Sequence, residues 1–264
     1  MTTTSETSTV KSTDGTKIEL DRKGDGPALV IIGAGPTDRT ANAPVAELLA
    51  DQFTVFNYDR RARGGSGDTK PYAVDREYED LAAVIDVAGG SAHVYGTSGG
   101  AVVALEAAAR GFGVTKLGLW EPPYVLDDEP TRPPADYEAQ IASAVATGRP
   151  GDAVELFFTL AVGMPSEQVA PMRDLPFWPA MEGLAQALVY DAAVMGDFRP
   201  RPEQLGKVKV PALVVDGGTV PWMSRTADAV ADLVPGAQRQ TLPGQPHNVD
   251  PTAIAPALAD FFRA

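Results

Sequence analysis

The sequence contains no cysteine, which excludes disulfide bonds, thiolate catalysis and cysteine-ligated metal sites. It has only two histidines, His93 and His247, so a zinc site would have to be built mostly from carboxylates, an unusual ligand set. We therefore expect a functional site with no metal and no cofactor.

Basic residues are also scarce, because 22 lysines and arginines stand against 35 aspartates and glutamates, for a formal net charge of -13. Nucleic-acid binding draws on clustered lysine and arginine, so this balance argues against such a partner. No apolar run approaches the roughly eighteen residues that a membrane span requires, and residues 1–10 lack the basic and apolar regions of a signal peptide. We expect a cytoplasmic protein that acts on a small molecule, without a membrane partner; the oligomeric state stays open.

Apolar segments of strand length alternate along the chain with segments of helical periodicity. Strands are predicted at residues 27–32, 53–58, 92–95, 116–120, 210–215 and 238–242. Helices are predicted at residues 75–88, 98–110 and 224–234, and a closing helix begins at Asp250-Pro251. Strands that are apolar on both faces and alternate with helices indicate an α/β fold with a mostly parallel sheet. Residues 9–12 and 17–21 predict a hairpin before it.

The alternation stops between Glu121 and Val208. Five prolines open this segment, and only helical patterns follow, at residues 137–147, 152–162 and 179–195. We interpret residues 122–207 as a helical cap inserted into a core formed by residues 1–121 and 208–264.

Large apolar side chains are frequent in and after this segment. At helical spacing such residues most often pack in a core, but some can line an apolar pocket. The candidates for a substrate pocket are Phe157, Phe158, Trp178, Trp222 and Met223.

Ser98 lies in the sequence Gly96-Thr97-Ser98-Gly99-Gly100, between a predicted strand and a predicted helix. In a Gly-x-Ser-x-Gly turn the serine occupies a strained strand-to-helix connection, and small residues are needed where the two backbones nearly touch. The turn also places the amide of Gly99 at the helix N-terminus, where unpaired N–H groups favour negative charge. The motif alone also fits a glycine-rich structural turn. In this context it predicts a nucleophilic serine with half of an oxyanion hole.

A serine nucleophile needs a base, which is usually histidine. His93 lies on the same predicted strand as Ser98, about 16 Å away at about 3.3 Å per residue, so we expect a packed strand histidine. His247 lies in a loop just before the final helix and is the candidate base.

With these motifs in this order, the chain resembles the α/β-hydrolase superfamily from about residue 17 to the C-terminus. Residues 58–66 are similar to that family's Asp-x-Arg-Gly-x-Gly-x-Ser loop, with Ala62 in place of a glycine. Gly33 and Ala34 stand where the family has the His-Gly pair of its oxyanion loop. The resemblance implies an α/β-hydrolase fold, a second oxyanion amide from Gly35, and a catalytic histidine at the position of His247.

The resemblance offers two positions for the acid of the triad. In many members it follows the strand equivalent to residues 210–215, but Val220 occupies that position here. In others, including haloalkane dehalogenases, a glutamate directly follows the strand after the nucleophile helix, as Glu121 does here. We predict that Glu121 orients His247, with Asp216 in reserve. The structural alternative for Glu121 is an ion pair with an arginine of the inserted helical segment. The structural alternative for Asp216 is the capping of a helix or turn.

Together these residues predict a serine hydrolase that cleaves a carboxylic ester, thioester or lactone of a small apolar substrate through an acyl-enzyme. The altered oxyanion loop also leaves open a non-hydrolytic binding protein, or a biosynthetic cyclase or lyase, on the same fold. A cofactor-free haloperoxidase or perhydrolase would have a similar triad. Finally, Gly33-Ala34-Gly35 followed by Asp59 resembles a dinucleotide fingerprint of an NAD-dependent oxidoreductase, although Asp38 at the third glycine position would repel a pyrophosphate.

Overall fold

The computed structural model describes residues 5–127, 129 and 132–264 of the chain. Within these residues eight strands form one sheet in the order β1-β2-β4-β3-β5-β6-β7-β8. The strands are β1 (Glu6–Lys11), β2 (Lys17–Lys23), β3 (Ala28–Ile32), β4 (Thr54–Tyr58), β5 (Ala92–Thr97), β6 (Val114–Trp120), β7 (Ala212–Gly218) and β8 (Gln238–Gln245). β2 pairs antiparallel with β1 and with β4, and the other neighbouring pairs are parallel. The predicted α/β class, mostly parallel sheet and N-terminal hairpin are therefore confirmed.

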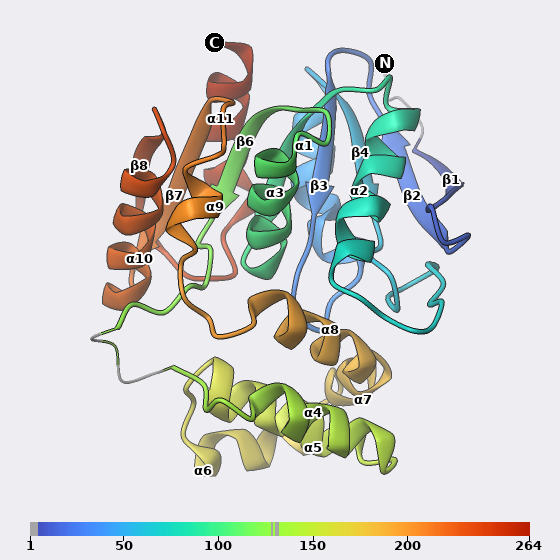
Figure 1. Cartoon of the computed structure of the whole chain (residues 1–264), viewed down its shortest axis with the longest axis vertical. Coiled ribbons are helices and arrows are strands. Elements are labelled where there is room, and N and C mark those ends of the chain that lie inside the picture. Colours follow the sequence, from blue (N-terminus) through green and yellow to red (C-terminus); the bar gives the residue numbers. More distant parts are fainter. Residues whose placement is uncertain (1–4, 128, 130–131) are drawn as a thin grey trace.

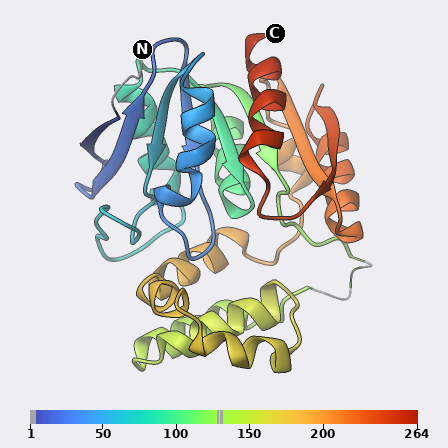
Figure 2. The same cartoon turned by 180° about the vertical axis from the view of Figure 1, so that it is seen from behind.

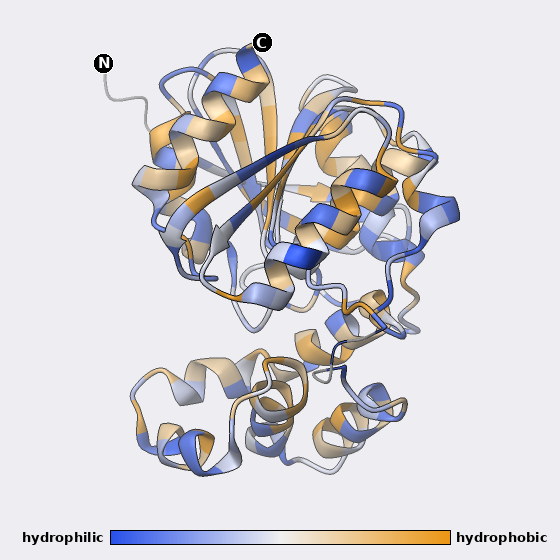
Figure 3. Cartoon of the chain, turned by 90° about the vertical axis from the view of Figure 1, so that its left-hand side faces the viewer, coloured by the Kyte–Doolittle hydropathy of each residue, from blue (hydrophilic) through white to orange (hydrophobic). Residues whose placement is uncertain are grey.

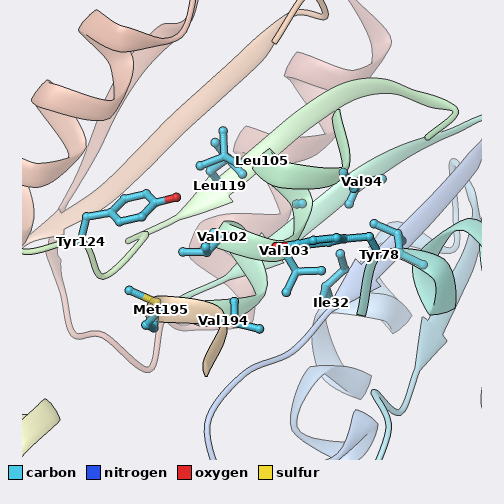
Figure 4. Packing of buried hydrophobic residues seen from close by; sticks show 14 of the residues in the cluster. Ile32, Tyr78, Val94, Val102, Val103, Leu105, Leu119, Tyr124, Val194 and Met195 are labelled. Carbon is cyan, nitrogen blue, oxygen red and sulfur yellow. The ribbon is translucent and has the colours of Figure 1, made fainter. Parts of the chain in front are cut away.

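Helices cover both faces of the sheet (Figures 1 and 2). One face carries α2 (Asp75–Val87), α3 (Gly99–Arg110) and α10 (Pro221–Leu233), and the other carries α1 (Ala43–Leu49), preceded by the 3-10 turn η1 (Arg39–Asn42), and α11 (Pro251–Arg263). Buried apolar clusters lie on each side. In one of them Val102, Val103 and Leu105 of α3 lie close to Ile32 of β3 and Leu119 of β6 (Figure 4). This packing fixes α3 and therefore the turn that precedes it.

A second group of helices lies beyond the carboxyl ends of the parallel strands (Figures 1 and 3). It contains α4 (Tyr137–Ala146), α5 (Pro150–Leu156), the π-helical turn η2 (Phe157–Ala161), α6 (Ser166–Val169), the 3-10 turn η3 (Ala170–Asp174), α7 (Trp178–Gly183) and α8 (Ala185–Met195). The short helix α9 (Pro202–Leu205) leads back toward β7. The prediction of one helix over residues 152–162 is corrected, because the chain becomes π-helical at Phe157. The predicted helix over residues 179–195 is likewise divided at Leu184.

Hydrophobic residues are concentrated in the central strands of the sheet and on the helix faces turned toward them, whereas the edge strands β1 and β8 are mostly polar (Figure 3). In the part of the chain that the structure describes, no helix is both long enough and apolar enough to cross a lipid bilayer. The buried apolar residues form two clusters that pack among the strands and the helices around them.

Candidate active site

Ser98 follows β5 with φ 50° and ψ -125°. A positive φ is uncommon for a residue other than glycine, so this turn stores backbone strain. The neighbouring glycines make it possible. A Cβ atom on Gly96 would lie 2.6 Å from the carbonyl oxygen of Gly100, and one on Gly100 would lie 2.5 Å from that of Ile32. No larger residue fits at either position, because β3, β5 and the start of α3 are in direct backbone contact.

The two predicted oxyanion amides lie beside the turn. Gly99 is the first residue of α3, so no earlier helical turn supplies a carbonyl to accept its N–H. The loop after β3 packs against the same point, since a Cβ atom on Gly99 would lie 3.5 Å from the Cβ of Ala34. Gly35, Ser98 and Gly99 line one cavity. The structure therefore brings together a hydroxyl and two backbone segments that can supply N–H donors.

His247 and Glu121 form a hydrogen-bonded pair. The Nδ1 atom of His247 lies 2.6 Å from Oε2 of Glu121, and Oε1 of Glu121 accepts a hydrogen bond of 3.0 Å from the amide of Gly217. Glu121 is buried at the end of β6, and its amide donates to the carbonyl of Val215 on β7. Both oxygens of the carboxylate thus have hydrogen-bond partners. Because Nδ1 of His247 is bound to Glu121, Nε2 is the imidazole nitrogen that can accept a proton.

His247 and Ser98 line the same cavity, although they come from distant parts of the chain. Among the described residues no hydrogen bond joins the Ser98 hydroxyl to the imidazole. Such a contact is commonly long without substrate and shortens when the reacting complex forms.

Asp216, the reserve candidate, contacts other partners. Its carboxylate accepts hydrogen bonds from Ser224 and from Thr241 at 2.7 Å, and pairs with Arg239 at 2.9 Å. Burial by itself would raise the pKa of Asp216, but the hydrogen bonds from these three side chains hold it below its usual value. Asp216 therefore joins β7, β8 and α10, and the carboxylate next to the imidazole is Glu121.

This difference predicts that Asp216→Asn lowers the free energy of unfolding at pH 7 by about 2–3 kcal/mol, because it weakens a buried charged network. Since the pKa of Asp216 is lowered in the folded state, its contribution is complete above the ordinary carboxyl pKa and is lost as pH falls through the lowered value. The difference between the two proteins in urea unfolding should therefore begin to shrink only below about pH 4 and vanish below the lowered pKa of Asp216. Asp228→Asn is the matched control, because Asp228 is an exposed partner of the same Arg239 and should change stability much less.

His93 lies at the opposite, amino end of β5. Its ring stacks on Phe262 with centroids 5.1 Å apart, and its Nδ1 atom lies 2.8 Å from the hydroxyl of Thr115. Partial burial and the charge of Lys116 lower its pKa. The expectation of a packed strand histidine agrees with this placement.

Two cavities meet at Ser98 and His247. The smaller has a volume of about 230 Å³, and the larger about 1020 Å³. They share Gly35, Ser98, Phe157, Val162 and His247. The smaller cavity is mostly apolar, with walls that include Val125, Met195, Phe198, Val220, Trp222 and Met223. A substrate bound at Ser98 would therefore extend into two spaces of different size.

Four of the five predicted pocket residues lie at these cavities. Phe157 lines both, Phe158 lines the larger one, and Trp222 and Met223 line the smaller one. The prediction for Trp178 is corrected, because it lines neither. It is buried inside the cap, where it stacks on Phe158 with centroids 6.1 Å apart. Its helical spacing among apolar residues fitted both roles.

Asp191 of α8 also lines the smaller cavity, and the sequence reasoning missed it. The sequence did contain a signal for this residue, because Asp191 is the single charged residue in α8. A lone carboxylate in an otherwise apolar helix is costly to bury unless it has a partner.

Asp59, the acidic residue of the dinucleotide alternative, is buried and already engaged. Its Oδ1 accepts from the amide of Arg39 at 2.7 Å, and its Oδ2 accepts from the amide of Gly65 at 2.8 Å. It follows that Asp59 has no exposed carboxylate for a ribose. In the same loop Ala62 has φ 60°, a conformation that glycine adopts without strain. This explains why a glycine suits the position of Ala62 in the similar family motif.

Comparison with known proteins places the chain among hydrolases of this fold. The model of the alpha/beta hydrolase family matches residues 29–257. An alpha/beta hydrolase from Sphaerobacter thermophilus DSM 20745 is 50% identical, with a TM-score of 0.90 over 97% of this chain and 100% of that one. A thermophilic esterase from Thermogutta terrifontis is 23% identical, with a TM-score of 0.74 over 98% of each chain.

Among curated proteins, the uncharacterized hydrolase YraK of Bacillus subtilis (strain 168) is 30% identical over 100 residues. That match spans 36% of this chain and 37% of the relative. The family match, in contrast, extends over most of the sheet and the cap helices. The chain belongs to the alpha/beta hydrolase family.

Proposed function

We propose that this hydrolase cleaves a carboxylic ester, thioester or lactone of a small apolar substrate through an acyl-enzyme on Ser98. The observation that carries the proposal is the contact between His247 Nδ1 and Glu121 Oε2, at 2.6 Å, in a cavity that Ser98 also lines. A buried carboxylate that fixes one imidazole tautomer beside a strained serine is the arrangement that activates a hydroxyl.

In this mechanism the Ser98 oxygen attacks the substrate carbonyl carbon, and its proton passes to Nε2 of His247. Glu121 holds the Nδ1 proton and stabilises the imidazolium that forms. The amides of Gly35 and Gly99 donate to the oxyanion. Collapse of the tetrahedral intermediate expels the alcohol or thiol, which takes the proton from His247. Water then attacks the acyl-enzyme with His247 as base, and the acid is released.

The two cavities suggest how the substrate is divided. The smaller, apolar cavity fits a short or compact acyl group, and the larger one can hold the leaving group. Two proteins whose solved structures have the same fold are named for this kind of chemistry. One is the esterase above, and the other is an enol-lactonase from Burkholderia xenovorans LB400, which is 22% identical with a TM-score of 0.71.

A fluorophosphonate probe tests the proposal, because only an activated serine reacts with it quickly. We expect Ser98 to be labelled, and p-nitrophenyl esters, thioesters and lactones of increasing chain length to show a preference for short apolar acyl groups. The rate should fall on acidification, because a protonated imidazole cannot accept the Ser98 proton. A folded protein that is not labelled would instead support a binding protein, cyclase or lyase. A haloperoxidase or perhydrolase would be labelled as well, and it differs in that hydrogen peroxide, in place of water, attacks its acyl-enzyme.

A further inference from the structure

Asp191 introduces a negative charge into the wall of the smaller cavity. It lies on α8, and its side chain is 13% exposed. Oδ1 accepts a hydrogen bond of 2.7 Å from Arg60 and another of 2.7 Å from Arg63. Burial by itself would raise the pKa of Asp191, but these two arginines hold it below its usual value. The carboxylate is therefore ionised at neutral pH.

The two arginines are hidden behind Asp191. Arg60 and Arg63 are 1% and 2% exposed, and neither belongs to the lining of the cavity. Arg60 also pairs with the buried Glu77 at 2.9 Å. Two cations and two carboxylates therefore balance in this cluster. Without Asp191, one positive charge would be left beside the cavity.

We propose that Asp191 is a specificity-determining residue, which occupies the position where a substrate carboxylate would otherwise pair with Arg60 and Arg63, and so restricts the smaller cavity to uncharged acyl groups. This inference rests on the proposed function, with the acyl group in the smaller cavity.

Two physical arguments support this assignment. A second carboxylate in the cavity would lose its hydration without gaining a cation, because the charges of Arg60 and Arg63 are already balanced by Asp191 and Glu77. The arginine pair, in contrast, is suited to carboxylate, because guanidinium groups offer several donors in a fixed plane. Within the described part of the chain, the second terminal nitrogen of Arg60 is buried without a hydrogen-bond partner. The donors that a ligand carboxylate would take over are Nη1 of Arg60 and Nη2 of Arg63, which now bind Asp191 at 2.7 Å.

The test compares two esters of equal acyl length, p-nitrophenyl hexanoate and mono-p-nitrophenyl adipate, whose free carboxylate is ionised at pH 7. We expect the wild-type protein to prefer the hexanoate ester by about 100-fold or more in kcat/KM. Asp191→Ala should lower this preference by about 100-fold or invert it, because it leaves one positive charge without a partner and opens the way to the arginines. An unchanged ratio in the variant would overturn the inference.

Met195→Ala is the matched control. Met195 lies one helical turn beyond Asp191 and lines the same cavity, so its truncation makes room without uncovering a cation. The adipate-to-hexanoate ratio should stay at the wild-type value. If Met195→Ala raised the ratio as much as Asp191→Ala did, extra space would explain the effect and the inference would fail.

A binding measurement separates this inference from the proposed function. Monomethyl adipate should raise the melting temperature of Asp191→Ala and leave that of the wild-type protein unchanged. If monomethyl adipate stabilises Asp191→Ala but the protein hydrolyses no ester, the arginine site is retained and the proposed function is rejected. If the protein hydrolyses esters but Asp191→Ala shows neither stabilisation nor an altered preference, the inference alone is rejected. If Asp191→Ala does not fold, Asp191→Asn retains an acceptor for the arginines, and it should still reduce the preference for hexanoate by about tenfold.

Discussion

Replacing Ser98 with alanine should lower kcat/KM for p-nitrophenyl butyrate by on the order of a thousandfold or more, because it removes the hydroxyl that forms the acyl-enzyme in the proposed mechanism. The remaining rate would come from the oxyanion donors and from substrate binding, which the substitution leaves in place. Steady-state kinetics, together with loss of fluorophosphonate labelling, measure the effect. Ordinary turnover by the alanine variant would exclude Ser98 as the nucleophile.

The control for this experiment is Ser143→Ala, which removes the same hydroxyl from an exposed position on the cap helix α4. Its rate and labelling should match those of the wild-type protein. Circular dichroism and urea unfolding of both variants then separate a chemical effect from a folding defect, since a folded but inactive Ser98→Ala protein is the expected result.

The substitution Glu121→Gln should lower kcat by on the order of 10³- to 10⁴-fold with little change in KM. The glutamine amide can donate toward Nδ1 of His247, which favours the tautomer with its proton on Nε2. That tautomer cannot accept the Ser98 proton. The measurement is kcat on p-nitrophenyl butyrate across a pH series, with KM as the internal check on substrate binding.

Asp216→Asn provides the comparison for Glu121→Gln, because each variant removes one buried carboxylate near the ends of neighbouring strands. We expect Asp216→Asn to affect unfolding and Glu121→Gln to affect turnover. The reverse pattern, with kcat lost in Asp216→Asn and retained within tenfold in Glu121→Gln, would make Asp216 the acid of the triad.

Most of the sheet was predictable because the parallel strands β3 to β7 are largely apolar and buried, so that their segments stand out from the helices between them. The turn at Ser98 was predictable for a local reason, since Gly96 and Gly100 are required where backbones touch. Glu121 was one of two candidates. The pairing of β6 with β7 brings both carboxylates to the same end of the sheet, and only the contact between His247 and Glu121 distinguishes them.

Other features depend on contacts that a one-dimensional pattern does not contain. The short helix α1 was not predicted, because seven residues with a proline near the start show little periodicity. The π-helical turn at Phe157 and the burial of Trp178 result from packing within the cap. The lone charge of Asp191 was visible in the sequence, but its partners were not, since they lie more than 100 positions earlier in the chain.

The three side chains of the proposed triad follow β5, β6 and β8, and Glu121 and His247 are separated by 126 positions in the sequence. Such parallel pairings form slowly, because long stretches of chain must be ordered before they come together. During refolding, ester hydrolysis should therefore return only after the outermost strand on the C-terminal side has docked. Enzymatic turnover is in this respect a reporter of the docking of β8 onto β7.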